Sequence, residues 1–173
     1  MELTEDHIRA ISRRAKDHVV EGIVDYQYIL EEHDITPGPR RQMFLAQLAH
    51  ESDGFRTTRE YASGRAYEGR TDLGNTEPGD GVRFRGRGLI QLTGRYNYEK
   101  FGDLLYEDLV DYPEDVEDFP LALEVSALYW SNRGLNRLAD QGRFRTITRR
   151  INGGLNGISD REYYLRKTKS LGL

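Results

Sequence analysis

The sequence predicts a mainly α-helical protein, and three observations support this fold class. Apolar residues recur at helical spacing before residue 52 and after residue 95. Residues that favour helix starts precede several of these stretches. Residues 62–88 are rich in glycine and follow no periodic pattern. No repeat or linker divides the chain, so its 173 residues are predicted to form a single domain, residues 1–173.

The first two predicted helices are amphipathic. Thr4 is expected to cap the first one, with Glu5 and Asp6 in its first turn, where acidic groups favour the helix dipole. The buried stripe of the first helix is predicted to be Leu3, Ile8, Ile11 and Ala15, and that of the second Val19, Val20, Ile23, Val24, Gln27 and Leu30.

The third predicted helix, from Pro37 to about Ser52, is followed by a long loop. Thr36 is its expected cap, and Gly54 can adopt the left-handed conformation that ends a helix. Residues 62–88 are predicted to be irregular, and long loops inside compact domains are often functional.

The remaining elements are predicted from shorter signals. Residues 89–93 are expected to form a short strand of a small hairpin or sheet, and helices are expected near 95–106, 120–132 and 142–151. Ser159 and Glu162 have capping-box spacing, which predicts the start of the last helix. Trp130 is assigned to the core.

Two glutamates, Glu51 and Glu60, have the character of an acid–base pair. Phe44, Leu48 and Glu51 share one helix face because they are spaced i, i+4 and i+7. A carboxyl group at the edge of an apolar stripe is partly desolvated, which favours the protonated form that a general acid requires. Glu60 follows a turn in a polar segment, where a carboxylate stays ionised. Two carboxyl groups in such different environments are the minimum needed for glycoside hydrolysis.

Three segments carry a family resemblance: His50–Phe55 with Glu60, then Phe84–Tyr98, and Arg150–Gly154. They resemble family 19 glycoside hydrolases, which are lysozyme-like chitinases and related bacteriophage endolysins. The resemblance runs from about residue 36 to residue 161. It implies a lysozyme-like helical domain whose central cleft separates two lobes. It also implies hydrolysis of β-1,4 bonds in an aminosugar polymer, with inversion at the anomeric carbon.

The resemblance implies a role for each matching residue. Glu51 is the general acid, Glu60 is the base that activates water, and Thr93 holds this water. The predicted substrate-binding residues are His50, Glu68, Gln91, Tyr96, Asn97, Asn152 and Arg161. Asn152 is also a candidate helix C-cap. Arg161 matches an arginine near the second carboxylate, but a plain surface arginine is also compatible with its sequence context.

Glu68 is the alternative to Glu60 as the second carboxylate. Compact bacterial members of the family place it nine residues after the first, as in Glu60, whereas plant members have a longer insertion. If Glu60 is the base, Glu68 is expected to pair with an arginine such as Arg70 or Arg87.

Metal, cofactor and nucleic-acid functions are not predicted. The chain has no cysteine, its four histidines are scattered, and it lacks an HExxH motif, so neither a metal site nor an organic cofactor is expected. The net charge of −4 argues against general nucleic-acid binding, and one Arg-Gly tract at 83–88 is a weak signal for it. No apolar run reaches transmembrane length. A monomer without stable membrane insertion is expected.

Charge is distributed unevenly along the chain. Residues 103–118 hold eight acids and no base, whereas the chain from Arg133 onward has ten Lys and Arg against three acids. Such runs are either solvated helix faces or, for the basic run, a surface that meets an anionic polymer.

Chain length, the lack of cysteine and the absence of a signal-peptide pattern favour a bacteriophage endolysin that cleaves peptidoglycan. Such a protein is expected in the host cytoplasm and acts on the wall after the membrane is permeabilised. The alternative is a chitinase that acts on chitin oligomers. A catalytically inactive carbohydrate-binding relative is a further alternative, which the presence of both carboxylates disfavours.

Overall fold

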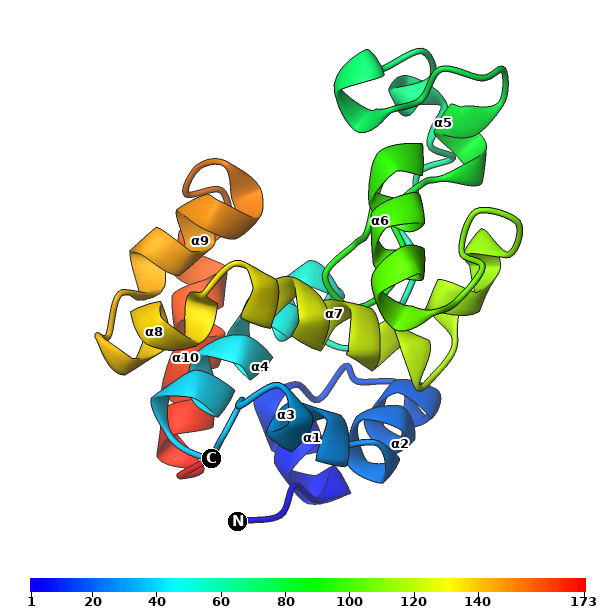
Figure 1. Cartoon of the computed structure of the whole chain (residues 1–173). Coiled ribbons are helices and arrows are strands. Elements are labelled where there is room, and N and C mark those ends of the chain that lie inside the picture. Colours follow the sequence, from blue (N-terminus) through cyan, green and yellow to red (C-terminus); the bar gives the residue numbers. More distant parts are fainter.

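The computed structural model describes residues 1–173, and its regular secondary structure is almost entirely helical (Figure 1). The α-helices are α1 (Glu5–Ile11), α2 (Asp17–Asp25), α3 (Tyr28–Glu32), α4 (Pro39–Glu51), α5 (Asp80–Arg83), α6 (Arg95–Leu105), α7 (Leu121–Asn132), α8 (Leu135–Asp140), α9 (Phe144–Asn152) and α10 (Ile158–Ser170). The 3₁₀ helices are η1 (Arg65–Tyr67), η2 (Thr71–Leu73) and η3 (Pro113–Glu117). The predicted helical fold class is confirmed. None of these helices has the length and apolar character needed to cross a bilayer.

The helices before residue 52 agree with the sequence prediction only in part. The Thr4 hydroxyl accepts a hydrogen bond from the His7 amide, and the His7 ring accepts one from the Thr4 amide. The second predicted helix is divided into α2 and α3, and Gln27 turns its side chain to the backbone of Leu3. Helix α4 begins after Gly38, which has a φ of 105°. Gly38 therefore occupies the N-cap position that was expected for Thr36.

Two other predictions are corrected, and one helix has no counterpart among the predicted elements. The expected strand at 89–93 is mostly turn, and β pairing is limited to single bridges of Arg87 with Arg59 and with Leu92. The predicted capping box at Ser159 does not form, because α10 begins after Gly157 and Glu162 pairs with Arg145. Helix α8 was not predicted at all.

Two hydrophobic cores divide the molecule into two lobes. The larger core contains 29 buried residues from α1–α4, α7–α10 and the segments next to them, and Trp130 packs there edge-on against Phe44 at 5.3 Å between centroids. The smaller core consists of Phe84, Leu92, Tyr98, Phe101, Leu109, Val116 and Val125. Helix α7 runs between the lobes in Figure 1 and contributes to both cores, Trp130 to the larger and Val125 to the smaller.

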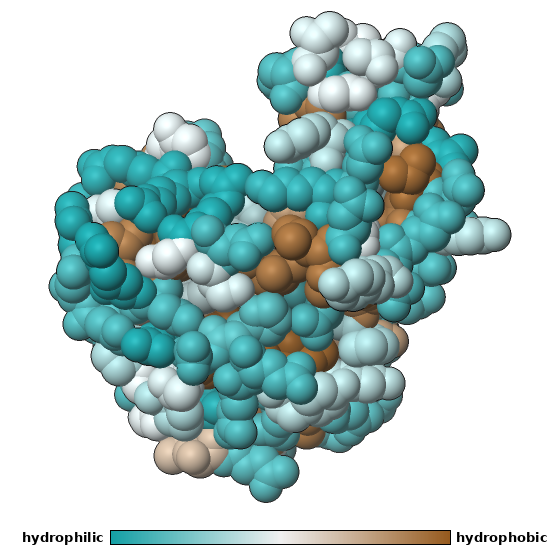
Figure 2. Space-filling view, in the orientation of Figure 1, coloured by the Kyte–Doolittle hydropathy of each residue, from teal (hydrophilic) through white to brown (hydrophobic).

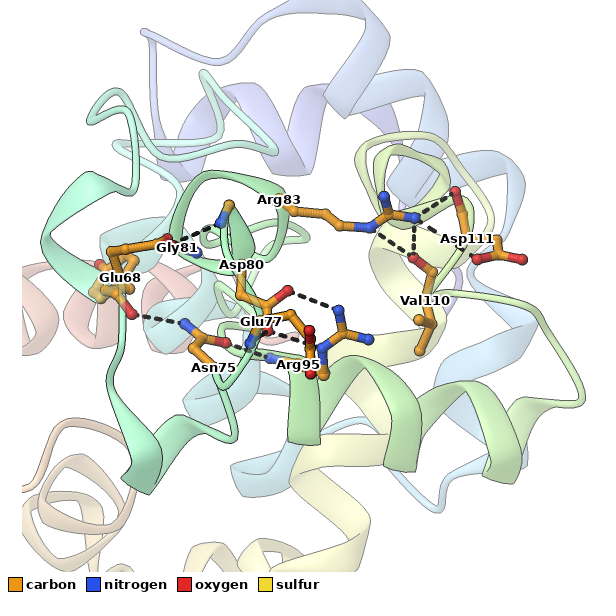
Figure 3. Close-up of polar contacts among 11 residues, drawn as sticks. Glu68, Asn75, Glu77, Asp80, Gly81, Arg83, Arg95, Val110 and Asp111 are labelled. Carbon is orange, nitrogen blue, oxygen red and sulfur yellow. Dashed lines mark hydrogen bonds and ion pairs between the residues drawn. The ribbon is translucent and has the colours of Figure 1, made fainter.

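Polar contacts hold the glycine-rich part of the smaller lobe together (Figure 3). Asp80 accepts two hydrogen bonds from Arg95, at 2.9 and 2.7 Å. Asn75 links the Tyr67 carbonyl to the Arg95 amide, at 2.9 Å on each side. Glu68 accepts hydrogen bonds from two backbone amides nearby. Because this segment has few apolar residues, such contacts take the place of an apolar core.

We expect Asp80→Asn to lower the free energy of unfolding by about 2 kcal/mol, because the buried Arg95 contact loses its charge. The Asp80 side chain is 2% exposed, and Arg95 lowers the pKa of Asp80 from its ordinary value. The stabilisation is therefore present above about pH 4 and is lost as the pH falls through the lowered pKa.

Urea unfolding followed by circular dichroism measures this difference. The control is Asp72→Asn, which removes an exposed ion pair with Arg70 and should leave the free energy of unfolding nearly unchanged, because solvent screens such a pair. Equal effects of both substitutions would contradict the assigned role of the Asp80 contact.

Candidate active site

A cavity of about 190 Å³ lies between the two lobes. The smaller-lobe side contributes Leu73, Gln91, Leu92, Thr93 and Asn97, and α7 contributes Val125, Tyr129 and Arg133. Ile151 comes from α9, and Ile90 belongs to the larger core. Figure 2 shows an apolar patch on the surface between the lobes. The predicted central cleft is thus present, and it contains three of the predicted site residues: Gln91, Thr93 and Asn97.

Glu60 is not part of the cavity lining but lies beside Gln91 and Thr93, which are. Its Oε2 accepts a hydrogen bond from the Tyr67 hydroxyl at 2.9 Å, whereas Oε1 is buried without a partner. A Cβ atom at Gly86 would lie 3.1 Å from Glu60 Oε2, 3.3 Å from Thr93 Oγ1 and 2.6 Å from Gln91 Oε1. The three side chains therefore converge on one glycine, which leaves room for them. A buried carboxylate oxygen without a hydrogen-bond partner is unfavourable, and such unsatisfied groups often occur at functional sites.

Gln91 and Thr93 are held by backbone contacts. Gln91 has a φ of 54°, a left-handed conformation that is strained for a residue with a side chain. The Thr93 hydroxyl donates to the Gln91 carbonyl at 3.0 Å, and Asn97 donates to the Thr93 carbonyl at 2.8 Å. Strain of this kind persists only where the surrounding contacts enforce it, so the fold fixes the position of Thr93 relative to Glu60.

Glu51 ends α4 and is paired with a buried arginine. Its side chain is 19% exposed, and its Oε1 lies 2.7 Å from Nη2 of Arg161. Arg161 is 1% exposed and also donates to Gln47 Oε1 at 2.5 Å and to the Asn156 carbonyl at 3.1 Å. Gln47 in turn donates to the Thr148 hydroxyl of α9 at 2.9 Å. Both sequence expectations for Arg161 are wrong: it contacts the first carboxylate rather than the second, and it is not on the surface.

Tyr129 lines the cavity from α7. Burial raises the pKa of the Tyr129 hydroxyl, Arg133 lowers it, and the negative charge of Glu51 raises it further.

Five predicted binding residues lie outside the cavity lining: His50, Glu68, Tyr96, Asn152 and Arg161. His50 Nδ1 is 2.7 Å from Asp160 Oδ2, and its ring fills the space beside Gly157, so it is held against the start of α10. Tyr96 is 57% exposed on α6. Asn152 is the exposed last residue of α9, and Gly153 is the residue that ends the helix. Their roles in substrate binding stay predictions.

Glu68 stabilises the loop rather than pairing with an arginine. Its two carboxylate oxygens accept hydrogen bonds from the amides of Gly79 and Gly81 at 2.7 and 2.8 Å. The expected pairing with Arg70 or Arg87 is wrong, because Arg70 pairs with Asp72 and Arg87 with Glu117. Because both of its oxygens are bound to backbone amides, Glu68 is less suited than Glu60 to act as the base.

Sequence reasoning did not identify Tyr67, Gln47, Tyr129 or Arg133. For Gln47 a signal existed, because it precedes Glu51 by one helical turn and shares its face. For Tyr67, nothing in the sequence indicates that a residue of the irregular loop folds back onto Glu60.

Comparison with known proteins places the chain in a family, although no family model matches the sequence. It is 35% identical over 179 residues to a Haemophilus influenzae protein named "Glycosyl hydrolase family 19 domain-containing protein", covering 83% of this chain and 86% of that one. It is also 35% identical over 136 residues to an endochitinase of Arabidopsis thaliana, covering 75% of this chain and 47% of that one.

Two crystal structures have similar folds. Chitinase C from Streptomyces griseus has a TM-score of 0.78 at 20% identity, covering 98% of this chain and 76% of that one. The class IV chitinase from Zea mays has a TM-score of 0.60 at 21% identity, covering 98% and 82%.

The helical fold that the chain shares with these chitinase structures, and its match to a family 19 glycosyl hydrolase protein, define it as a glycoside hydrolase. The chain belongs to glycoside hydrolase family 19, as the sequence motifs predict. It spans about half the length of the Arabidopsis endochitinase that it matches.

We expect Tyr67→Phe to lower kcat by roughly tenfold, because Glu60 loses the donor that orients its carboxylate. The control is Tyr61→Phe, which removes the same kind of bond, from an exposed tyrosine to Asp53 at 2.8 Å. Steady-state kinetics on a soluble aminosugar oligomer compares them. An unchanged kcat for Tyr67→Phe would contradict the orienting role.

Proposed function

We propose that the chain hydrolyses β-1,4 glycosidic bonds of bacterial peptidoglycan in a single inverting step. Glu51 is the general acid, and Glu60 is the general base. The observation that carries this proposal is the convergence of Glu60 Oε2, Gln91 and Thr93 on Gly86. The other oxygen of Glu60, Oε1, is buried without a hydrogen-bond partner.

In this mechanism Glu60 accepts a proton from a water molecule that the Thr93 hydroxyl holds. The water attacks the anomeric carbon from the face opposite the departing sugar, while Glu51 protonates the leaving oxygen. When Glu51 loses its proton, the resulting carboxylate is stabilised by the charge-assisted hydrogen bond from Arg161, which lies 2.7 Å away. Tyr67 keeps the Glu60 carboxylate oriented toward the water, and no metal or organic cofactor enters the reaction.

Charge supports peptidoglycan as the substrate. Peptidoglycan carries carboxylates on its muramyl residues and peptides, whereas chitin is neutral. Arg133 lines the cavity, and Arg150 lies on the neighbouring α9. The relatives named endochitinases favour chitin as the second candidate. A role as an endolysin, made inside the host and acting after membrane permeabilisation, is part of the same proposal.

We expect the purified protein to release soluble fragments from peptidoglycan, with new reducing ends detectable by mass spectrometry. Glu51→Gln keeps the shape of the side chain but removes its proton, so activity should fall by at least ~10²-fold. Glu21→Gln, at an exposed position of α2, is the control and should retain wild-type activity.

Near wild-type lysis by Glu51→Gln would overturn the assignment of the acid. Cleavage of chitin oligomers without cleavage of peptidoglycan would replace the proposed substrate but leave the two carboxylate roles in place.

A further inference from the structure

Arg133 and Arg150 form a pair on the side of the cavity formed by α7 and α9. Nη1 of Arg133 donates to the Arg150 carbonyl at 3.1 Å, and Nη1 of Arg150 donates to the Arg133 carbonyl at 2.9 Å. The Arg133 guanidinium also lies over the Tyr129 ring, 4.2 Å from its centroid. Because each guanidinium is fixed by a backbone carbonyl, the fold sets the positions of both positive charges.

The charges of this arginine pair have no anionic partner in the protein. Arg145 on the same helix pairs with Glu162 at 3.0 Å, and Arg161 pairs with Glu51, but neither Arg133 nor Arg150 forms an ion pair. A guanidinium has five N–H donors, so one bond to a carbonyl leaves most of them free. Two like charges held close together without a counter-charge repel each other, and a bound anion would relieve this repulsion.

The arginine pair is accessible and lies beside the predicted catalytic residues. Arg133 and Ile151 line the same cavity as Gln91 and Thr93, and Arg150 precedes Ile151 on α9. Both arginines are exposed to solvent. A substituent on a sugar bound in the cavity can therefore reach them without any rearrangement of the chain.

We propose that Arg133 and Arg150 form a subsite for a carboxylate carried by the substrate. This inference rests on the proposed function and narrows its substrate to aminosugar strands with acidic substituents. Planar guanidinium groups match carboxylates in geometry and bind them with charge-assisted hydrogen bonds. The carboxylate comes either from the lactyl group of a muramyl residue or from the peptide attached to it. The N-acetylglucosamine units of chitin have neither.

The experiment compares the kcat/KM of the full chain on three substrates of equal length: chitin oligomers, muramyl strands without peptides, and muramyl strands with peptides. We expect Arg133→Gln and Arg150→Gln to lower the ratio of muramyl to chitin kcat/KM by roughly tenfold at low salt, and by less at high salt. Arg149→Gln removes the same charge from the next position on α9, outside the pair, and should leave the ratio unchanged. A loss only on peptide-bearing strands would assign the carboxylate to the peptide.

Equilibrium binding separates this inference from the proposed function. Binding of muramyl-containing oligomers is measured by titration of the Glu51→Gln variant, which requires no turnover. Introducing Arg150→Gln into this variant should weaken the binding by roughly tenfold. Loss of muramyl binding in this variant would support the subsite even if only chitin were hydrolysed. If the ratio of muramyl to chitin kcat/KM is the same in all the arginine variants, the subsite is overturned. The proposed function still stands in that case if cleavage of peptidoglycan depends on Glu51.

Discussion

Helix α7 is the element on which the arrangement of the two lobes depends, because it is buried in both hydrophobic cores. Trp130 belongs to the larger core and Val125 to the smaller, and Tyr129 between them lines the cavity. Because α7 is packed into both cores, it cannot shift without disturbing the side-chain packing of both lobes. The cavity wall is therefore fixed by the same side chains that stabilise the two lobes.

Each carboxylate is held by a polar network of a different kind. Glu51 is tied through Arg161 and Gln47 to Thr148, so the end of α4 is linked to α9 and α10 by buried hydrogen bonds. Such a network is favourable only when every member is satisfied, which constrains the side-chain positions closely. Glu60 is held by Tyr67 from the glycine-rich loop, and that loop depends on contacts such as those of Asp80 and Glu68. The acid thus belongs to the rigid lobe and the base to the lobe that polar contacts stabilise.

The sequence predicts features that depend on near neighbours in the chain. The Thr4 cap, the apolar face of α4 and the position of Trp130 in the core follow from local spacing. Features that depend on distant residues were missed or misplaced. Arg161 contacts Glu51 from 110 positions away, and nothing in its local sequence marks it as buried. The convergence of Glu60, Gln91 and Thr93 requires folding of the loop around Gly86, and the expected strand at 89–93 is replaced by a strained turn.

The central claim is that one water molecule, activated by Glu60, displaces the leaving sugar in a single step. The stereochemistry of the product tests this claim most directly. Proton NMR in the first minutes of cleavage of a β-linked aminosugar oligomer detects the new anomer before mutarotation. A single inverting step predicts that the α anomer accumulates first. Initial accumulation of the β anomer would contradict the mechanism, because it requires two successive displacements and a carboxylate that acts as a nucleophile.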